Sequence, residues 1–209
     1  MSRPADNLEP LAEQIRQTLS LRDAAREKAL PLAREVIRHS GLAIRAIHRQ
    51  EFDRAAESLT SARRLLAQIK QSPAVTRELF NTSFVRDAEK EFAEGHITLA
   101  LVTGKTLPGP DELEVDAAAY LNGLGEAAGE LRRYLLDGMR RGDLSRGEEL
   151  LEAMDSIYGV LVTMDFPDAI TGGLRRTTDM VRGVLEKTRS DLTLVIRQKE
   201  LEEKINKLK

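Results

Sequence analysis

The helical character of the chain is clearest in the stretch LPLAREVIRHSGLAIRAIHR, residues 30–49. Its apolar side chains recur every three or four residues, which is the period of an amphipathic α-helix. The arginines of the same stretch fall within about 60° of Arg34 on a helical wheel, beside the apolar face. This stretch therefore predicts a helix with one buried and one basic face. The apolar residues are Leu30, Ala33, Val36, Ile37, Ile44 and Ile47, and the arginines are Arg34, Arg38, Arg45 and Arg49.

The same composition extends over the rest of the chain. Of its 209 residues 41% are apolar and 32% charged, with few aromatic residues and no tryptophan, as in long amphipathic helices. No segment alternates with the two-residue period of a strand, and the clearest break is the loop at residues 104–110. We therefore expect one all-α domain over residues 1–209. The helices are expected at residues 5–19, 21–49, 53–70, 74–102, 115–141, 144–164, 167–189 and 191–209.

Several classes of protein are excluded or disfavoured by what the sequence lacks. The absence of cysteine excludes disulfides, thiolate metal sites and cysteine nucleophiles, and it suits a reducing cytoplasm. No apolar run approaches the roughly 20 residues that cross a bilayer, and the first residues do not resemble a signal peptide. No phosphate-binding glycine loop and no Glu-x-x-His motif occurs. We expect a cytoplasmic protein without membrane contact.

Charge is distributed unevenly along the chain, although the formal net charge is only −2. Residues 22–70 hold 11 Lys and Arg against 6 Asp and Glu, whereas residues 71–131 hold 4 against 11. A basic region that binds phosphates and an acidic region that binds metal would explain this pattern. An uneven solvated surface would explain it equally well.

The arginine face of residues 34–49 is a candidate nucleic-acid interface. Guanidinium groups arrayed along one side of a helix can follow a phosphate backbone, and Gly41 would let a strand approach closely. His48 lies at the flank of this face. The alternative is a solvated face with local carboxylate pairs, but Glu35 lies off the arginine face and no acid shares it.

Two pairs of glutamates are candidate metal ligands. Glu91 and Glu94 fall on the apolar face of their helix, where a lone charge is costly and needs a cation or an arginine beside it. A polar subunit interface would also explain them. Glu126 and Glu130 share one side of their helix but lie opposite its apolar face, so on their own they fit an ordinary solvated surface.

At these residues the sequence resembles the translin/Trax family, and Trax more than translin. The resemblance extends from about Leu21 to Arg197. It departs from Trax at Glu126, where Trax usually has Asp, and at Gly41-Leu42, where Trax has two basic residues. The matching motifs are REVIRHS (34–40), AIHR (46–49), EFAE (91–94), YLNGL (120–124), GEL (129–131) and GD (142–143).

The resemblance implies a seven-helix bundle that assembles into a closed homo-oligomeric shell, an octamer or a hexamer. It further implies a metal-dependent endoribonuclease acting on single-stranded RNA with Mg²⁺ or Mn²⁺. The acidic quartet of Trax corresponds to Glu91, Glu94, Glu126 and Glu130. The expected RNA-binding residues are Arg34, Arg38, Arg45, His48 and Arg49. Two alternatives stay open: a translin-like shell that binds single-stranded RNA or DNA without cleaving it, and a helical scaffold that binds no nucleic acid.

Overall fold

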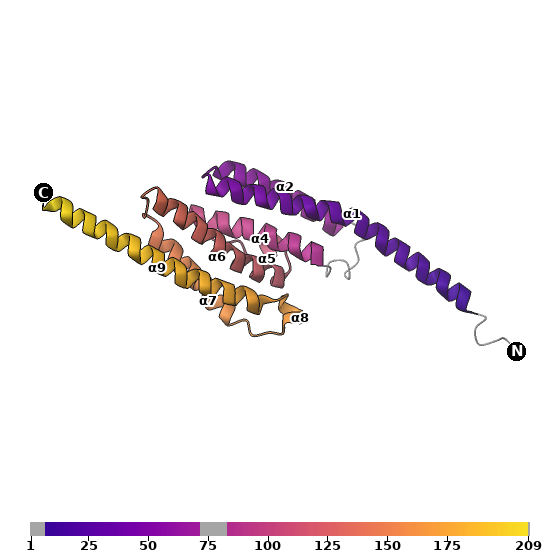
Figure 1. Cartoon of the computed structure of the whole chain (residues 1–209). Helices are drawn as coiled ribbons and strands as arrows, with labels where there is room; N and C mark the ends of the chain where they lie inside the picture. The colour runs from indigo at the N-terminus through magenta and orange to yellow at the C-terminus, as the bar shows by residue number, and fades with distance from the viewer. Residues whose placement is uncertain (1–6, 72–82, 209) are drawn as a thin grey trace.

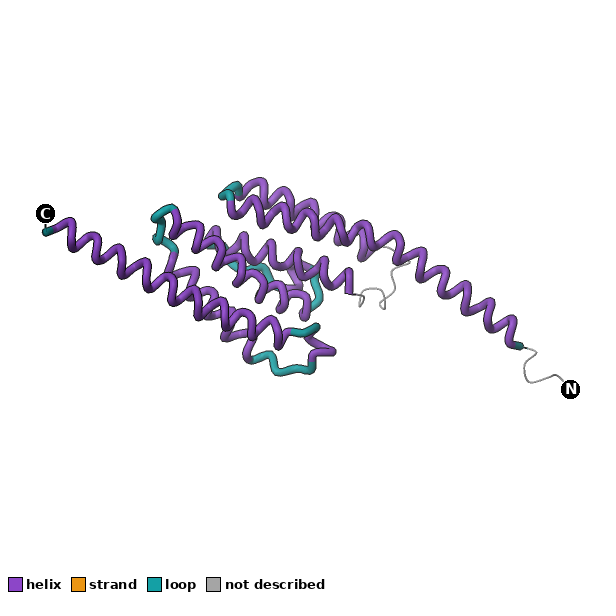
Figure 2. The backbone as a smooth tube through the Cα atoms, viewed as in Figure 1, coloured by secondary structure: helices purple, strands orange, loops and turns teal. Residues whose placement is uncertain are grey.

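The computed structural model describes residues 7–71 and 83–208, and within these ranges the chain is helical without a strand. This confirms the expected all-α class. Figure 2 shows that loops are confined to short connections between the helices. No helix in the described part of the chain combines the length and the apolar character needed to cross a membrane. The helices are α1 (Leu8–His48), α2 (Phe52–Gln71), α4 (Ser83–Thr103), α5 (Pro110–Leu113), α6 (Ala117–Arg140), α7 (Gly147–Val162), α8 (Asp168–Thr171) and α9 (Leu174–Lys207).

The helices pack in three layers. α1 and α2 lie side by side on one side, α4 and α6 form the middle, and α7 and α9 lie on the other side (Figure 1). The middle layer is buried on both faces, and Phe92 on α4 and Leu131 on α6 are fully buried in the core. Small residues let helices approach closely here: a Cβ added to Gly95 of α4 would lie 2.8 Å from Leu59 of α2.

The two longest helices extend beyond this body in opposite directions (Figure 1). In α1 no residue before Ala25 is buried, and in α9 no residue after Leu192 is buried. Large apolar side chains remain exposed on both ends. They are Leu8, Leu11, Ile15, Leu19 and Leu21 on α1, and Leu194, Leu201 and Ile205 on α9.

Several predicted helix boundaries were wrong. α1 is continuous through residue 20, and α9 is continuous through residue 190, where breaks were expected. A serine that would cap a helix is also tolerated inside one when the helical pattern continues on both sides. The predicted helix at 167–189 is instead divided after α8, because Gly172 and Gly173 have φ of 63° and 88°, a left-handed conformation that ends a helix.

The helix expected at 74–102 is described from Ser83 onward, and its first residues lie outside the described part of the chain. The predicted loop at 104–110 is present, and it is followed by the single turn α5. The next long helix begins at Ala117 rather than 115. Asp116 caps it by accepting hydrogen bonds from the backbone N–H groups of Ala118 (2.9 Å) and Ala119 (3.4 Å).

Candidate metal centre

The candidate site lies where α4 and α6 come closest. The contact depends on Gly123: a Cβ there would lie 2.7 Å from the carbonyl oxygen of Lys90 and 3.1 Å from the backbone nitrogen of Glu94. Only a residue without a side chain lets the two backbones meet at this distance. Glu126 lies about one turn farther along α6 and therefore faces α4.

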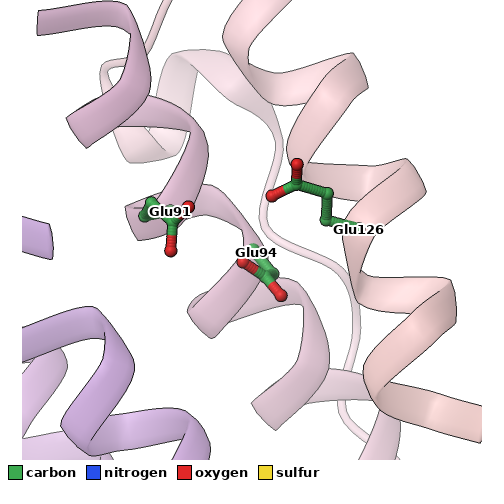
Figure 3. Close-up of side chains that lie close together, drawn as sticks. All are labelled: Glu91, Glu94 and Glu126. Carbon is green, nitrogen blue, oxygen red and sulfur yellow. The ribbon is translucent and has the colours of Figure 1, made fainter. Parts of the chain in front are cut away.

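Three of the four predicted carboxylates meet across this contact. Glu91, Glu94 and Glu126 each place an oxygen within 4.8 Å of the others, from two different helices (Figure 3). Glu94 is buried, with 8% of its surface exposed, and the other two are half-buried. An all-oxygen set of ligands suits a hard divalent cation such as Mg²⁺ or Mn²⁺.

The three carboxylates have less positive charge beside them than their full ionisation would require. Burial, together with the charges of Glu91, Glu126 and Glu130, raises the pKa of Glu94 from 4.5 to about 8. Burial also raises the pKa of Glu91, against the opposing effect of Lys90. Carboxylates this close cannot all ionise unless a cation compensates them. These three residues therefore fit a divalent cation and could hold one.

Lys90 is a member of the candidate site that the sequence pattern did not reveal. Its Nζ lies 2.7 Å from Glu126 Oε1 and 3.6 Å from Glu91 Oε1, so it bridges the two helices. Burial lowers the pKa of Lys90, but the hydrogen bond to Glu126 and the charges of Glu126, Glu91 and Asp87 outweigh this effect and raise it. In the sequence Lys90 stands among several acidic residues, which indicates that it pairs with one of them. Its pairing with Glu126 of α6 is not evident from the sequence.

The fourth predicted ligand, Glu130, is not part of the three-carboxylate group in the described residues. Its Oε2 instead lies 2.5 Å from His48 Nε2 and 3.9 Å from Arg133 Nη1. Its charge nevertheless raises the pKa of Glu94. Glu130 is thus a neighbour of the cluster, bound to a side chain of α1.

His48 is placed differently from the arginines with which it was grouped. Its side chain is only 6% exposed and points to Glu130, whereas Arg34, Arg38 and Arg45 on α1, and Arg49 directly after it, are exposed. His48 Nδ1 has no hydrogen-bond partner within the part of the chain that is described. The geometry therefore connects His48 to the acidic cluster rather than to an exposed phosphate-binding face.

The arginine face also carries an acid that was not expected from the sequence. Arg38 Nη2 lies 2.6 Å from Glu35 Oε2, and both side chains are about half exposed. On a wheel the two residues are about 60° apart, a separation that two long side chains span easily. The expectation that no acid shares this face was wrong, although surface pairs of this kind are weak and can give way to phosphate.

Comparison with known proteins identifies relatives over almost the whole chain. Structures of AfC3PO, one of them in complex with duplex RNA, are 34–35% identical, with TM-scores of 0.82–0.83. The match covers 90% of this chain and 97% of AfC3PO. NeC3PO in its apo structure is 18% identical, with a TM-score of 0.76, and the match covers 93% of this chain and 99% of NeC3PO. This similarity supports the fold alone.

The uncharacterized protein MJ0175 of Methanocaldococcus jannaschii is 28% identical over 191 residues, which cover 91% of this chain and 85% of that protein. No model of a protein family matches the chain.

Proposed function

Because the chain belongs to the translin/Trax family, we propose that it is a metal-dependent endoribonuclease that cleaves single-stranded RNA. The observation that carries the proposal is the convergence of Glu91, Glu94 and Glu126 at the contact between α4 and α6. A purely structural cluster would be expected to include its own compensating cations. Within residues 7–71 and 83–208 a single lysine, Lys90, pairs with members of the cluster, and the pKa of Glu94 is raised to about 8.

In the proposed reaction water breaks a P–O bond of the RNA backbone and leaves a phosphate monoester and a hydroxyl group. Glu91, Glu94 and Glu126 would hold Mg²⁺ or Mn²⁺. A divalent ion supplies a Lewis acid for the phosphate and lowers the pKa of water. The Lys90 ammonium group would add a positive charge beside the reacting phosphate. His48 would hold Glu130 in place beside the cluster.

The RNA backbone would lie along the exposed arginines of α1. Arg34, Arg38, Arg45 and Arg49 would contact phosphates without reading sequence. His48, the fifth residue that we grouped with them from sequence, would act through Glu130 instead. The relative AfC3PO was solved with duplex RNA, so the proposed preference for single strands has to be tested against duplex substrate directly.

The proposed active form is a closed homo-oligomer, an octamer or a hexamer, that acts in the cytoplasm. The exposed apolar side chains on the projecting ends of α1 and α9 support this assembly, because exposed apolar stripes are typical of protein–protein contacts. The absence of cysteine suits the cytoplasm.

The test is a cleavage assay on end-labelled single-stranded and duplex RNA, with Mg²⁺ and with EDTA. We expect Mg²⁺-dependent cleavage of the single strand, which is abolished in Glu91→Ala and in Glu130→Ala. Glu149→Ala is the matched control, because Glu149 is exposed and pairs only with Arg146 in the described chain. Cleavage by Glu91→Ala at the wild-type rate would overturn the proposal.

The second candidate is a shell that binds RNA or DNA without cleaving it. It is favoured by the internal partners of the acids, since Lys90 pairs with Glu126 and His48 with Glu130. EDTA separates the two functions, because it should abolish cleavage and leave binding largely intact.

A further inference from the structure

A cavity of about 510 Å³ opens beside the acidic cluster, where the starts of α4 and α6 face the turn between α8 and α9. Lys90 and Glu126 line it, so the cavity borders the cluster. Arg86 of α4 and Arg176 of α9 also line it. Its volume falls in the range of small-molecule sites.

The turn between α8 and α9 that lines the cavity is held by one buried amide. Asn122 Nδ2 donates to the carbonyl oxygens of Ala118 and Thr171, both at 2.8 Å, and Asn122 Oδ1 accepts from Thr177 Oγ1 at 2.7 Å. These bonds attach the turn at Gly172 to α6 and occupy both donors of the amide and its oxygen. The cavity is thus a fixed part of the fold.

The charges around the cavity are arranged for a ligand with both a phosphate and hydrogen-bond donors. Arg86 and Arg176 have no carboxylate or hydrogen-bond partner in the part of the chain described here, unlike Arg132 and Arg146, which are paired. Asp87 and Asp168 also line the cavity. Guanidinium groups bind phosphate oxygens, whereas carboxylates accept hydrogen bonds from ribose hydroxyl and base amino groups.

We propose that this cavity binds the nucleotide next to the cleaved phosphodiester, with its phosphate on Arg86 and Arg176. The position relative to the cleaved bond rests on the proposed function, but nucleotide binding in the cavity does not. A free inorganic anion would gain nothing from the two aspartates, and an uncharged ligand would leave the two guanidinium groups unpaired. A nucleotide satisfies both sets of groups.

The test measures binding without cleavage. The probe is a fluorescein-labelled uridine trinucleotide, and its anisotropy is followed in EDTA. We expect the Arg86→Ala/Arg176→Ala variant to bind about tenfold more weakly, equivalent to about 1.4 kcal/mol. The slope of log Kd against log salt should fall by about 0.7 for each phosphate that the variant no longer neutralises.

The matched control is Arg182→Ala, which removes an exposed arginine from the same helix, α9, away from the cavity. It should bind within twofold of wild type. Unchanged binding by the double variant would overturn the proposal. So would a change in its mass by light scattering, because a second copy would then cover the cavity. Binding that depends on both arginines, in a protein that cleaves no RNA in the Mg²⁺ assay, would support the cavity and refute the nuclease.

Discussion

Glu94→Gln in the metal-free protein should remove a pH dependence of stability that the wild type shows. In the folded chain burial and three neighbouring glutamates raise the pKa of Glu94 to about 8, against 4.5 for the ordinary carboxyl group. Between these two values the folded state keeps a proton that the unfolded chain has released. Wild-type stability should therefore be greatest below pH 4.5, as far as Glu94 is concerned, and fall as the pH rises towards 8.

The size of the effect follows from the same two values. At about 1.4 kcal/mol per pH unit, the full decline amounts to at most about 5 kcal/mol. A decline of this size is a large part of the 5–15 kcal/mol that is the typical free energy of unfolding of a domain. Even about half of this decline would be measurable. A glutamine has nearly the same shape as the protonated acid and no charge to bury, and its contribution should not change with pH.

The assay is urea unfolding in EDTA at pH 5.5, 7.0 and 8.5, followed by circular dichroism at one fixed protein concentration. The difference in unfolding free energy between Glu94→Gln and wild type should grow in favour of the variant as pH rises. Glu149→Gln is the control, because Glu149 is exposed and Arg146 lowers its pKa, so it is ionised in both states throughout this range. Parallel pH profiles for wild type and Glu94→Gln would refute the reasoning.

Three further results are expected. Mn²⁺ at 100 times its Kd should stabilise the folded wild type by about 2.7 kcal/mol, measured by thermal melting. Glu126→Gln should lose most of this stabilisation. Equal stabilisation of wild type and variant would count against the metal site. Gly123→Ala should destabilise the protein by about 1–3 kcal/mol because its Cβ meets the α4 backbone, whereas Gly129→Ala, with open space around its Cβ, should stabilise it by up to about 1 kcal/mol. His48→Ala should lower kcat for RNA cleavage about 10- to 100-fold with little change in KM, because it releases Glu130; steady-state kinetics in which only KM rises would favour a contact to RNA.

The helical fold was predictable because the apolar period is local information. The residues at which the helices begin and end were less predictable. Serine favours a helix start, but it does not force one, and α1 continues through residue 20 although none of its residues before Ala25 is buried. The break at Gly172 and Gly173 was present in the sequence as a glycine pair and was overlooked.

The candidate site was predictable in unequal parts. Glu91 and Glu94 were identifiable because their own helix places them on a face of apolar residues. Glu126 was not identifiable in this way, because α6 contacts α4 through Gly123, which has no side chain and leaves no apolar signal in the sequence. The pairings of Lys90 and His48 depend on how separate helices meet, which no periodicity within one helix reveals.

The projecting ends of α1 and α9 also have a consequence for local unfolding. Helical turns without tertiary contacts are stabilised only by their intrinsic helix propensity. A short helical segment of this kind is only marginally stable in water. In a free chain the backbone amides before Ala25 and after Leu192 should therefore exchange with solvent deuterium far faster than those of α4 and α6. Slow exchange in these end turns would mean that another molecule covers them, so deuterium uptake along two helices can map the assembly contacts amide by amide.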